Sequence, residues 1–288
     1  MKVANQWTGY RILSTGDGFK LERWGEVVLL RPDPQVIWSA RQSPVTGHQP
    51  PVWAEYLKAG GGGRWEIFRR PPNNWTVDYK GMKLGLKLMG FKHTGVFPEQ
   101  AVNWDLMAEL VRKRTANHQS PTVLNLFAYT GAASVALSMA GAEVTHVDAA
   151  KNMVERAGYN AKLNGVDNIR YIIDDCAKFI AREIKRGRKY DAIIMDPPSY
   201  GRGPSGELWK IEDNLFGLVK DAAKILSDAP LFFLINSYTT GLQPTVIKNI
   251  LQLNISGKGN FDAYEVGLPT DEGIDLPCGC SGLWACRL

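Results

Sequence analysis

From residue 122 onward, short apolar segments alternate with longer segments that have a helical period. TVLNLF, AEVTHVD, IRYIID, YDAIIMD and PLFFLINS predict buried strands, and GAASVALSMA, NMVERAGYNAKLNG and CAKFIAREIKRG predict helices between them. Because parallel strands need long crossover connections, this alternation predicts an α/β fold with a mostly parallel sheet and helices on both faces. Ligands of such folds bind outside the carboxyl ends of the strands.

The later part of the chain continues this pattern and then departs from it. Residues 208–226 predict a long helix, and QPTVIKNILQLN predicts another. The segments FDAYEVGL and GLWACRL then suit two strands of an antiparallel C-terminal hairpin. A helix beginning at Pro98, in PEQAVNWDLMAELVRKR, opens the α/β part. We therefore predict an α/β domain over residues 96–288.

Residues 1–95 have a different character. Runs such as EVVLLRP and RWEIFRRP, separated by proline and glycine, predict a small β-rich domain. This part carries 14 Lys and Arg against 7 Asp and Glu, whereas the remainder carries 20 against 22. A basic module favours a polyanionic partner such as RNA. An ordinary solvated surface remains the alternative.

Six of the nine tryptophans also lie in residues 1–95. Beside lysine and arginine residues, these rings could stack on the bases of a nucleic acid. Tryptophans in a small β domain also build the hydrophobic core. The sequence leaves both interpretations open.

Two classes of protein are disfavoured by composition. No apolar run approaches the roughly 18 residues of a membrane span, and the N-terminus lacks the apolar core of a signal peptide. The cysteines are Cys176, Cys278, Cys280 and Cys286, and the last three form C-x-C-x5-C without a second ligand pair. We therefore expect reduced thiols, no metal and a cytoplasmic location, and leave the oligomeric state open.

Polar residues stand at the carboxyl ends of the predicted strands. Asn125 lies in the first strand, Asp148 ends the second, Asp174 and Asp175 end the third, and Asp196 ends the fourth. The spacing from Asn125 to Asp148 is that of the acid which binds ribose hydroxyls in nucleotide-binding α/β folds. A stiff Pro-Pro corner follows Asp196. Together these residues predict a nucleoside site.

The turn after the first strand argues against a dinucleotide. A pyrophosphate needs about three glycines, whereas this turn has Gly131 alone, with Phe127 and Tyr129 in place of small residues. A ligand with ribose but no phosphate fits better. S-adenosylmethionine is the obvious ligand of that kind.

These motifs resemble the class I S-adenosylmethionine-dependent methyltransferases, which have a Rossmann-like sheet. NLFAYTGAAS joined to DAIIMDPPSYGRG carries the resemblance, together with LLRPDPQVIW, FKHTGVFPEQ, DDCAKFI and the terminal LP-G-SGLW. Within this class, the motifs most resemble the group typified by ribosomal RNA large-subunit methyltransferase I, which modifies cytosine C5. The similarity covers roughly residues 22–288. It implies that the partner of this protein is RNA, with ribosomal RNA as the first expectation.

The resemblance implies roles for individual residues. Those implied to bind the cofactor are Gln100, Asn125, Phe127, Ala128, Tyr129, Thr130, Gly131, Asp148, Ala149, Asp175, Cys176 and Asp196. Within this set, Asp148 would bind the ribose, and Asp175 with Cys176 would face the adenine. Those implied to border the methyl group and the target base are Asp196, Pro197, Pro198, Ser199 and Tyr200.

One departure from the family pattern bears on the reaction. Methylation at cytosine C5 needs a thiolate, which the family places just beyond the fifth strand, but here that stretch reads Ile235-Asn236-Ser237-Tyr238. Transfer to an exocyclic amine needs no thiolate, and Tyr200 could stack on the base. The base and atom therefore stay unassigned. A non-RNA acceptor, and an RNA-binding scaffold without turnover, are the alternatives.

Overall fold

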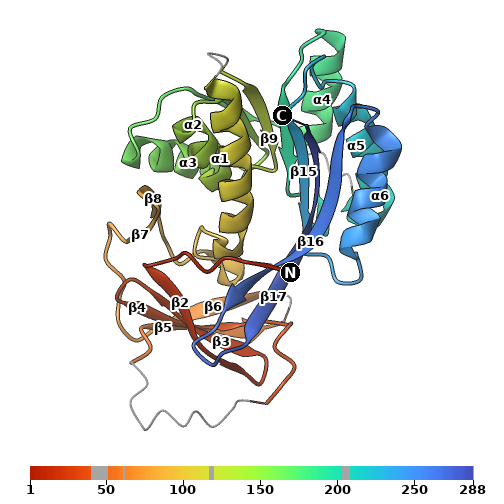
Figure 1. Ribbon diagram of the computed structural model, residues 1–288. Coiled ribbons are helices and arrows are strands. Elements are labelled where there is room, and N and C mark those ends of the chain that lie inside the picture. Colours follow the sequence, from red (N-terminus) through yellow and green to blue (C-terminus); the bar gives the residue numbers. More distant parts are fainter. Residues whose placement is uncertain (40–50, 61, 117–119, 203–207, 288) are drawn as a thin grey trace. The chain divides into compact units, whose positions relative to one another are not determined.

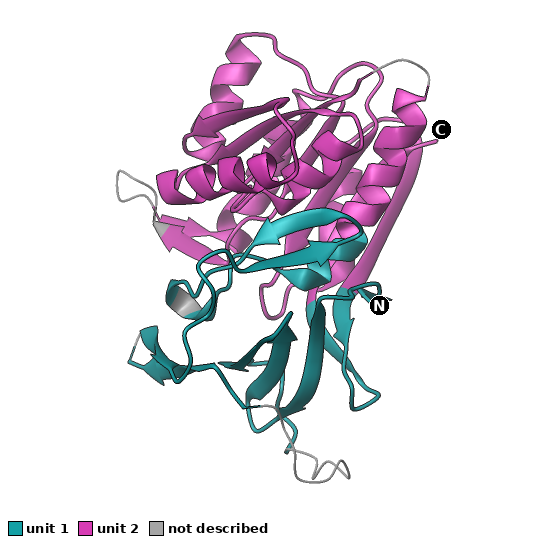
Figure 2. Ribbon diagram, turned by 90° about the vertical axis from the view of Figure 1, so that its left-hand side faces the viewer, with its two compact units in different colours: residues 1–102, 266–278 teal, residues 103–265, 279–288 magenta. Residues whose placement is uncertain are grey.

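The computed structural model describes residues 1–39, 51–60, 62–116, 120–202 and 208–287. The chain divides into two compact units (Figure 2). Unit 1 comprises Met1–Val102 and Val266–Cys278, and unit 2 comprises Asn103–Glu265 and Gly279–Leu288. The division predicted after residue 95 treats each part as one continuous segment of the chain. The segment Val266–Cys278 belongs to unit 1, although in the chain it lies between two parts of unit 2, and no local sequence signal marks it.

An eight-stranded sheet has the strand order β1-β16-β17-β15-β12-β9-β10-β11. Its strands are β1 (Lys2–Val3), β9 (Thr122–Leu126), β10 (Glu143–Asp148), β11 (Ile169–Ile173), β12 (Ala192–Met195), β15 (Phe232–Ser237), β16 (Gly259–Pro269) and β17 (Asp275–Cys286). Strands β15, β12, β9, β10 and β11 run parallel, and β17 pairs antiparallel with β15. This arrangement confirms the predicted mostly parallel sheet.

Helices cover both faces of this sheet. They are α1 (Ala101–Thr115), α2 (Ala132–Met139), α3 (Lys151–Leu163), α4 (Cys176–Lys185), α5 (Ile211–Ala223) and α6 (Pro244–Asn254). Figure 1 shows α1, α2 and α3 on one face and α4, α5 and α6 on the other. Strands β12 and β15 are buried throughout, as strands covered on both faces must be. Among the described residues, no helix is long and apolar enough to cross a membrane.

The long helix predicted over residues 208–226 begins later than expected. Leu208–Lys210 forms a short strand, β14, which pairs antiparallel with β13 (Tyr200–Arg202), and α5 starts at Ile211. The helical periodicity of the sequence includes Trp209, but strand pairing with β13 determines the conformation of residues 208–210. The β13–β14 hairpin follows directly on the Pro-Pro corner and so belongs to the neighbourhood of the predicted site.

Unit 1 contains a five-stranded sheet of order β2-β3-β4-β5-β6. Its strands are β2 (Tyr10–Gly16), β3 (Phe19–Trp24), β4 (Val27–Pro32), β5 (Ala54–Ala59) and β6 (Gly62–Ile67). A hairpin of β7 (Thr76–Tyr79) and β8 (Met82–Gly85) follows, and then the 3-10 turns η1 (Gly90–Lys92) and η2 (Pro98–Gln100). The predicted β-rich N-terminal region is confirmed.

The tryptophans of unit 1 belong to its interior rather than to an exposed stacking surface. Trp24, Trp53 and Trp75 are buried. The other three are half-buried, and each indole N–H donates within the unit: Trp7 to the Pro98 carbonyl, Trp38 to the Thr15 hydroxyl and Trp65 to the Met89 carbonyl. Of the two interpretations that the sequence left open, the core interpretation is the one that the structure supports.

Candidate functional site

The register of the parallel strands brings the predicted residues to one edge of the sheet. Met195 of β12 and Val147 of β10 both stand opposite Leu126 of β9, and Asp148 stands opposite Ile173 of β11. The carboxyl ends of these neighbouring strands therefore lie side by side. They carry Asp196, the turn after β9, Asp148 and the Asp174-Asp175 pair. The structure thus places these sequence-predicted groups next to one another.

The turn from Phe127 to Gly131 has an unusual backbone. Phe127, Tyr129 and Gly131 have φ angles of 55°, 52° and 80°, all in the left-handed region. Large aromatic residues seldom adopt this conformation, and it persists only where the surroundings enforce it. Here the backbone N–H of Phe127 donates to the Cys176 thiol at 3.3 Å, and that of Ala128 donates to the Val147 carbonyl at 3.1 Å. Such a held, strained turn is typical of a functional site.

Gly131 sits at the N-cap of α2, and it has no room for a side chain. A Cβ atom there would lie 2.7 Å from the Cβ of Ala157 on α3. Thr130 is buried and its carbonyl accepts a hydrogen bond from the Asn160 amide at 2.8 Å, so Thr130 fixes α3 to the turn. The N-terminus of α2 is consequently left without a side-chain cap and presents backbone N–H groups.

Asn125 is buried, and its amide N–H points away from the strand edge. It donates to the Ser134 hydroxyl at 3.0 Å, and Ser134 in turn contacts Nδ1 of His146 at 3.0 Å. Burial lowers the pKa of His146 to about 4, so the ring is neutral at pH 7. The Ser134 hydroxyl thus joins the Asn125 amide on β9 to the neutral ring of His146 on β10. Asn125 therefore orients α2 behind the turn.

Asp148 links the strained turn to the end of β10. Its Oδ2 accepts the N–H of Tyr129 and its Oδ1 accepts the N–H of Ala150, both at 2.8 Å. Burial raises the pKa of Asp148, while these two backbone N–H groups lower it. An ionised carboxylate has about four acceptor positions, so two hydroxyl donors can still bind to it. This is the chemistry that a ribose requires.

The third strand leads into α4. Asp175 is the N-cap of α4, and its carboxylate accepts the N–H of Lys178 at 2.9 Å. Asp174 forms an ion pair with Arg182. Burial raises the pKa of the Cys176 thiol, which therefore stays protonated beside the turn. Asp174 and Asp175 are both partly exposed, but Asp174 already binds Arg182 and the N–H of Asp175, so Asp175 is the carboxylate with more capacity to accept from an amine.

The Pro-Pro corner is held by residues that sequence reasoning missed. The indole N–H of Trp209 donates to the Pro198 carbonyl at 2.6 Å, and its ring lies 5.7 Å from that of Phe127. The Pro198 carbonyl is therefore already engaged and supports the corner. Trp209 lies in the stretch predicted to be helical, so nothing in the sequence placed it at the site.

The two residues after the prolines have different surroundings. The Ser199 hydroxyl lies 2.7 Å from the hydroxyl of Thr239, and the Ser199 carbonyl accepts the N–H of Ile211 at 3.1 Å. Tyr200 is 57% exposed at the start of β13. Its ring is thus accessible to a planar group, whereas Ser199 connects β12 to the loop after β15.

A chain of buried hydrogen bonds, here named the Asp196 relay, ends on the carboxylate of Asp196. Tyr264 donates to Asn103 at 2.8 Å, Asn103 donates to Ser281 at 2.9 Å, Ser281 donates to Asn236 at 2.9 Å, and Asn236 donates to Oδ1 of Asp196 at 3.0 Å. Amide nitrogens only donate, so the direction of every bond is determined. Burial raises the pKa of Tyr264, which keeps its proton.

Cys280 lies beside the end of β15, and its surroundings favour the protonated thiol. Cys280 stands opposite Ser237 in the β15–β17 pairing, at the strand end where the family pattern would place a thiolate. Its thiol is buried and donates to the Leu242 carbonyl at 3.3 Å, and burial raises its pKa to about 11. At neutral pH this thiol is protonated, and a protonated thiol does not add to a base.

Gln100 and Ala149 also belong to the residues that the sequence predicts to bind the cofactor. Gln100 ends η2 in unit 1 and is half-buried, and its role toward a ligand stays a prediction. Ala149 is exposed directly after Asp148. Within the described ranges, no three His, Cys, Asp or Glu side chains are grouped so that they could hold a metal ion.

Comparison with known proteins agrees with this geometry. A family model described as S-adenosylmethionine-dependent methyltransferase matches residues 57–229. A crystal structure of an S-adenosylmethionine-dependent methyltransferase from Agrobacterium tumefaciens superimposes with a TM-score of 0.89 and 29% identity, covering 99% of this chain and 93% of that one.

Curated relatives share part of the chain. Ribosomal RNA large subunit methyltransferase I of Salmonella arizonae is 33% identical over 133 residues, which is 45% of this chain and 31% of that protein. Ribosomal RNA large subunit methyltransferase K/L of Shewanella frigidimarina is 32% identical over 156 residues, 53% of this chain and 20% of that protein. The chain thus spans about a third or less of the length of these relatives.

The packing of Gly131 generates a prediction about stability. Gly131→Ala should lower the free energy of unfolding by about 1–2 kcal/mol through the left-handed backbone, and by about 1–3 kcal/mol more through the clash with Ala157. Urea denaturation measures the loss.

Gly158→Ala is the matched control, because Gly158 lies in α3 beside Ala157 and a Cβ there meets open space. That variant should gain about 0.5–1 kcal/mol from helix propensity. If the two variants were equally stable, the close approach of the turn to α3 would be wrong.

Proposed function

Because the chain belongs to the S-adenosylmethionine-dependent methyltransferases, we propose that it methylates RNA, with ribosomal RNA as the substrate class. The cofactor follows from the family. The RNA substrate is suggested by the printed functions of the curated relatives, which share only part of their length with this chain. A ribosomal target would agree with the cytoplasmic location that the sequence led us to expect.

We assign the cofactor to the strand edge around Asp148. The cofactor supplies an electrophilic methyl group on a sulfonium. The carboxylate of Asp148 would accept from the ribose hydroxyls, Asp175 would accept from the adenine amine, and the turn from Phe127 to Gly131 would border the methionine part. The strained turn supports this assignment, because its cost of about 1–3 kcal/mol per residue is retained where a ligand requires that shape.

We assign the acceptor base to the corner formed by Asp196 and the two prolines. A base is positioned best by acceptors that do not move, since preorganised groups lower the cost of reaching the reactive geometry. The Asp196 relay supports this assignment, because it fixes one oxygen of the carboxylate from inside the protein. Trp209 fixes the corner from the other side through the Pro198 carbonyl. Tyr200 is exposed enough to stack on the base.

The state of the thiols bears on the acceptor atom. Cys176 and Cys280 are buried, and burial raises the pKa of both. A C5 mechanism would require a thiolate, so we favour direct transfer to an exocyclic nitrogen, where Asp196 would accept the hydrogen bond of the amine. The Pro197 carbonyl would be a second acceptor, because the Pro198 carbonyl already binds Trp209.

We propose that RNA contacts unit 1 at the edge strand β6 and the residues after it. Phe68 is 59% exposed there, and Arg64, Arg69 and Arg70 are exposed beside it. The guanidinium of Arg69 lies 3.8 Å from the centroid of the buried Trp53 ring, which holds its position. An exposed aromatic ring among cations suits a single-stranded nucleic acid. We therefore expect RNA bases to stack on this surface and not on the tryptophans.

The observation that carries the proposed function is the alignment of Asp148, the strained turn and Asp196 at one sheet edge. Its test is incubation of the protein with methyl-labelled cofactor and purified ribosomal RNA, followed by nucleoside analysis by mass spectrometry. We expect a labelled N-methylated nucleoside, and none with Asp196→Ala. A labelled 5-methylcytidine would refute the assignment of the acceptor atom. The absence of any label in RNA would refute the substrate class.

The role of Asp148 can be tested through the affinity for the cofactor. Asp148→Ala should weaken S-adenosylmethionine binding by about 1–3 kcal/mol, because the ribose hydroxyls lose a charged acceptor and the turn loses its link to β10. Isothermal calorimetry measures the affinity. Asp167→Ala is the control, since Asp167 is exposed before β11 at the opposite end of the strand. Equal affinities for the two variants would place the ribose elsewhere.

The third prediction concerns the Asp196 relay. Ser281→Ala should lower kcat about tenfold or more, because Asn236 loses the contact that orients it toward Asp196. The dissociation constant of the cofactor should stay within about twofold of that of the wild-type protein, which separates positioning from general damage. Steady-state kinetics and calorimetry provide the two values.

Ser227→Ala is the matched control for this variant. The Ser227 hydroxyl also donates a hydrogen bond, to Asp191 at 2.7 Å, but at the amino end of β12. It should therefore cost stability without lowering kcat. A kcat that fell equally in both variants would show that the relay has no specific role.

A further inference from the structure

The β13–β14 hairpin presents two different faces. Gly201 stands opposite Trp209 in the antiparallel pairing, and Tyr200 stands opposite Lys210. Because successive side chains of a strand leave opposite faces, Trp209 and Tyr200 lie on different sides of the hairpin. Tyr200 is exposed, whereas Trp209 is half-buried and packs against the hydrophobic core of unit 2. One face of the hairpin is thus open, and the indole anchors the other.

Trp209 contacts two segments that the proposed function assigns to different reactants. Its indole N–H donates to the Pro198 carbonyl at 2.6 Å, so it binds the corner that would hold the base. Its ring centroid lies 5.7 Å from that of Phe127, with an angle of 49° between the ring planes. Phe127 belongs to the turn that would border the methionine part of the cofactor. One side chain therefore joins the donor side of the site to the acceptor side.

The ring contact with Phe127 has a favourable geometry. The separation lies within the range of about 4.5–7 Å in which aromatic rings attract one another, and the tilt brings the edge of one ring toward the face of the other. Phe127 has little freedom of its own, because its left-handed backbone N–H donates to the Cys176 thiol at 3.3 Å. Trp209 therefore rests against a turn that is itself held in place.

The hydrogen bond to Pro198 restricts one of the few torsions that the corner retains. The rings of Pro197 and Pro198 fix φ at about −65° in both residues, so the orientation of each carbonyl group depends on ψ. The bond from Trp209 holds ψ of Pro198. The next residue is held separately, because the Ser199 carbonyl accepts the N–H of Ile211. A shift of Trp209 would thus turn the peptide group of the corner.

We propose that Trp209 is a positioning residue for methyl transfer, which sets the acceptor corner relative to the turn that borders the methyl donor. This inference rests on the proposed function, since it concerns the same two parts of the site. Direct transfer requires that the reacting atoms be aligned, and a misplacement of about 1 Å can cost about 10²-fold in rate. In this role Trp209 acts through Phe127 and Pro198 and does not need to touch either reactant.

The consequence is a separation between rate and binding. The carboxylates assigned to the cofactor, Asp148 and Asp175, accept backbone N–H groups and make these hydrogen bonds without the indole. The exposed ring of Tyr200 leaves the other face of the hairpin. We therefore expect the loss of Trp209 to lower kcat and to change the affinity for the cofactor little.

Steady-state kinetics and calorimetry on the full chain test this role. Trp209→Phe retains a ring beside Phe127 and loses the indole N–H. Its kcat on ribosomal RNA should fall about tenfold or more, while the dissociation constant of S-adenosylmethionine should stay within about twofold of the wild-type value. The calorimetric stoichiometry counts the folded sites, so a loss of folded protein is not mistaken for a loss of rate. A kcat equal to that of the wild-type protein would overturn the proposal.

The ring contact is tested by a double-mutant cycle. Phe127→Leu should lower kcat less in the Trp209→Leu background than in the wild-type background, because the contact that it removes is already absent there. Effects on log kcat that simply add would show that the two rings act separately. That result would overturn the link between the turn and the corner.

Trp38→Phe is the matched control. Trp38 is also half-buried, and its indole N–H also donates one hydrogen bond, to the Thr15 hydroxyl at 3.1 Å within unit 1. The chemical change is the same, but kcat should equal that of the wild-type protein. An equal fall of kcat in Trp38→Phe and Trp209→Phe would indicate general damage and would contradict a specific role of Trp209.

Tryptophan fluorescence provides a readout that needs no acceptor. Binding of S-adenosylmethionine beside Phe127 should change the emission of Trp209, so the response of Trp209→Phe should be smaller than the responses of the wild-type protein and of Trp38→Phe. The same response in all three proteins would overturn the contact of Trp209 with the cofactor side. Methyl transfer by the wild-type protein to ribosomal RNA is measured in parallel. A failure of the proposed function appears there, whereas a failure of this inference appears in the comparison of the variants.

Discussion

The carboxylate of Asp148 holds the candidate site together. It accepts backbone N–H groups from both sides, from Tyr129 in the strained turn and from Ala150 after β10. Two aromatic residues of the turn have left-handed backbones that cost free energy, and this contact is one of those that retain them. The position of the turn, and hence the shape of the edge between β9 and β10, depends on that carboxylate together with the contacts of Phe127 and Ala128.

The polar groups at this edge divide into those that support the site and those that can meet a ligand. Asn125, Thr130 and Ser199 bind other parts of the protein through hydrogen bonds. Asp196 is oriented by a relay that begins on β16 and passes through α1, β17 and β15. Because the four residues that lead to Asp196 are buried and partnered, its carboxylate cannot turn without breaking the hydrogen bond from Asn236.

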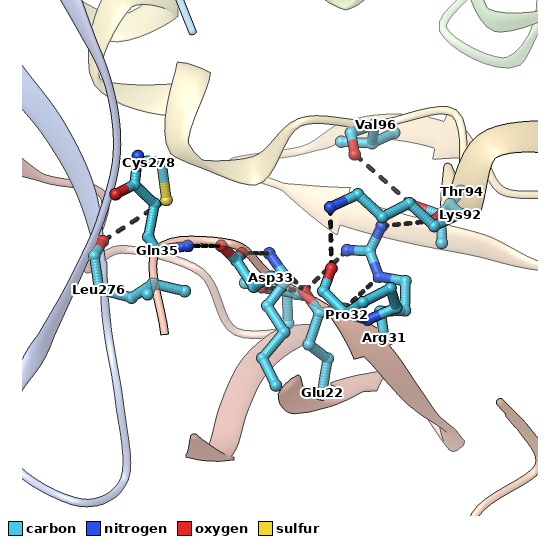
Figure 3. Close-up of polar contacts among 12 residues, drawn as sticks. Glu22, Arg31, Pro32, Asp33, Gln35, Lys92, Thr94, Val96, Leu276 and Cys278 are labelled. Carbon is cyan, nitrogen blue, oxygen red and sulfur yellow. Dashed lines mark hydrogen bonds and ion pairs between the residues drawn. The ribbon is translucent and has the colours of Figure 1, made fainter. Parts of the chain in front are cut away.

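Unit 1 shows how little a charge count says about a surface. Two of its cations, Arg31 and Lys20, are compensated by Glu22 and Asp33 (Figure 3). Its tryptophans pack within the unit. What is left for a polyanion is smaller and better defined: the exposed arginines and Phe68 near β6. Binding at these places would be sensitive to salt and specific in position.

The sequence by itself determined the parallel α/β sheet and the positions of Asp148, Asp175 and Asp196 at strand ends, because the alternation of strands and helices along the chain follows from local periodicity. It also argued against a pyrophosphate turn. Only the tertiary structure decided which of these polar groups are engaged by partners. Trp209, Asn236 and Ser281 became visible only there, since their contacts join segments distant in the chain. Hydrogen-bond partners over such separations leave no periodic trace in a single sequence.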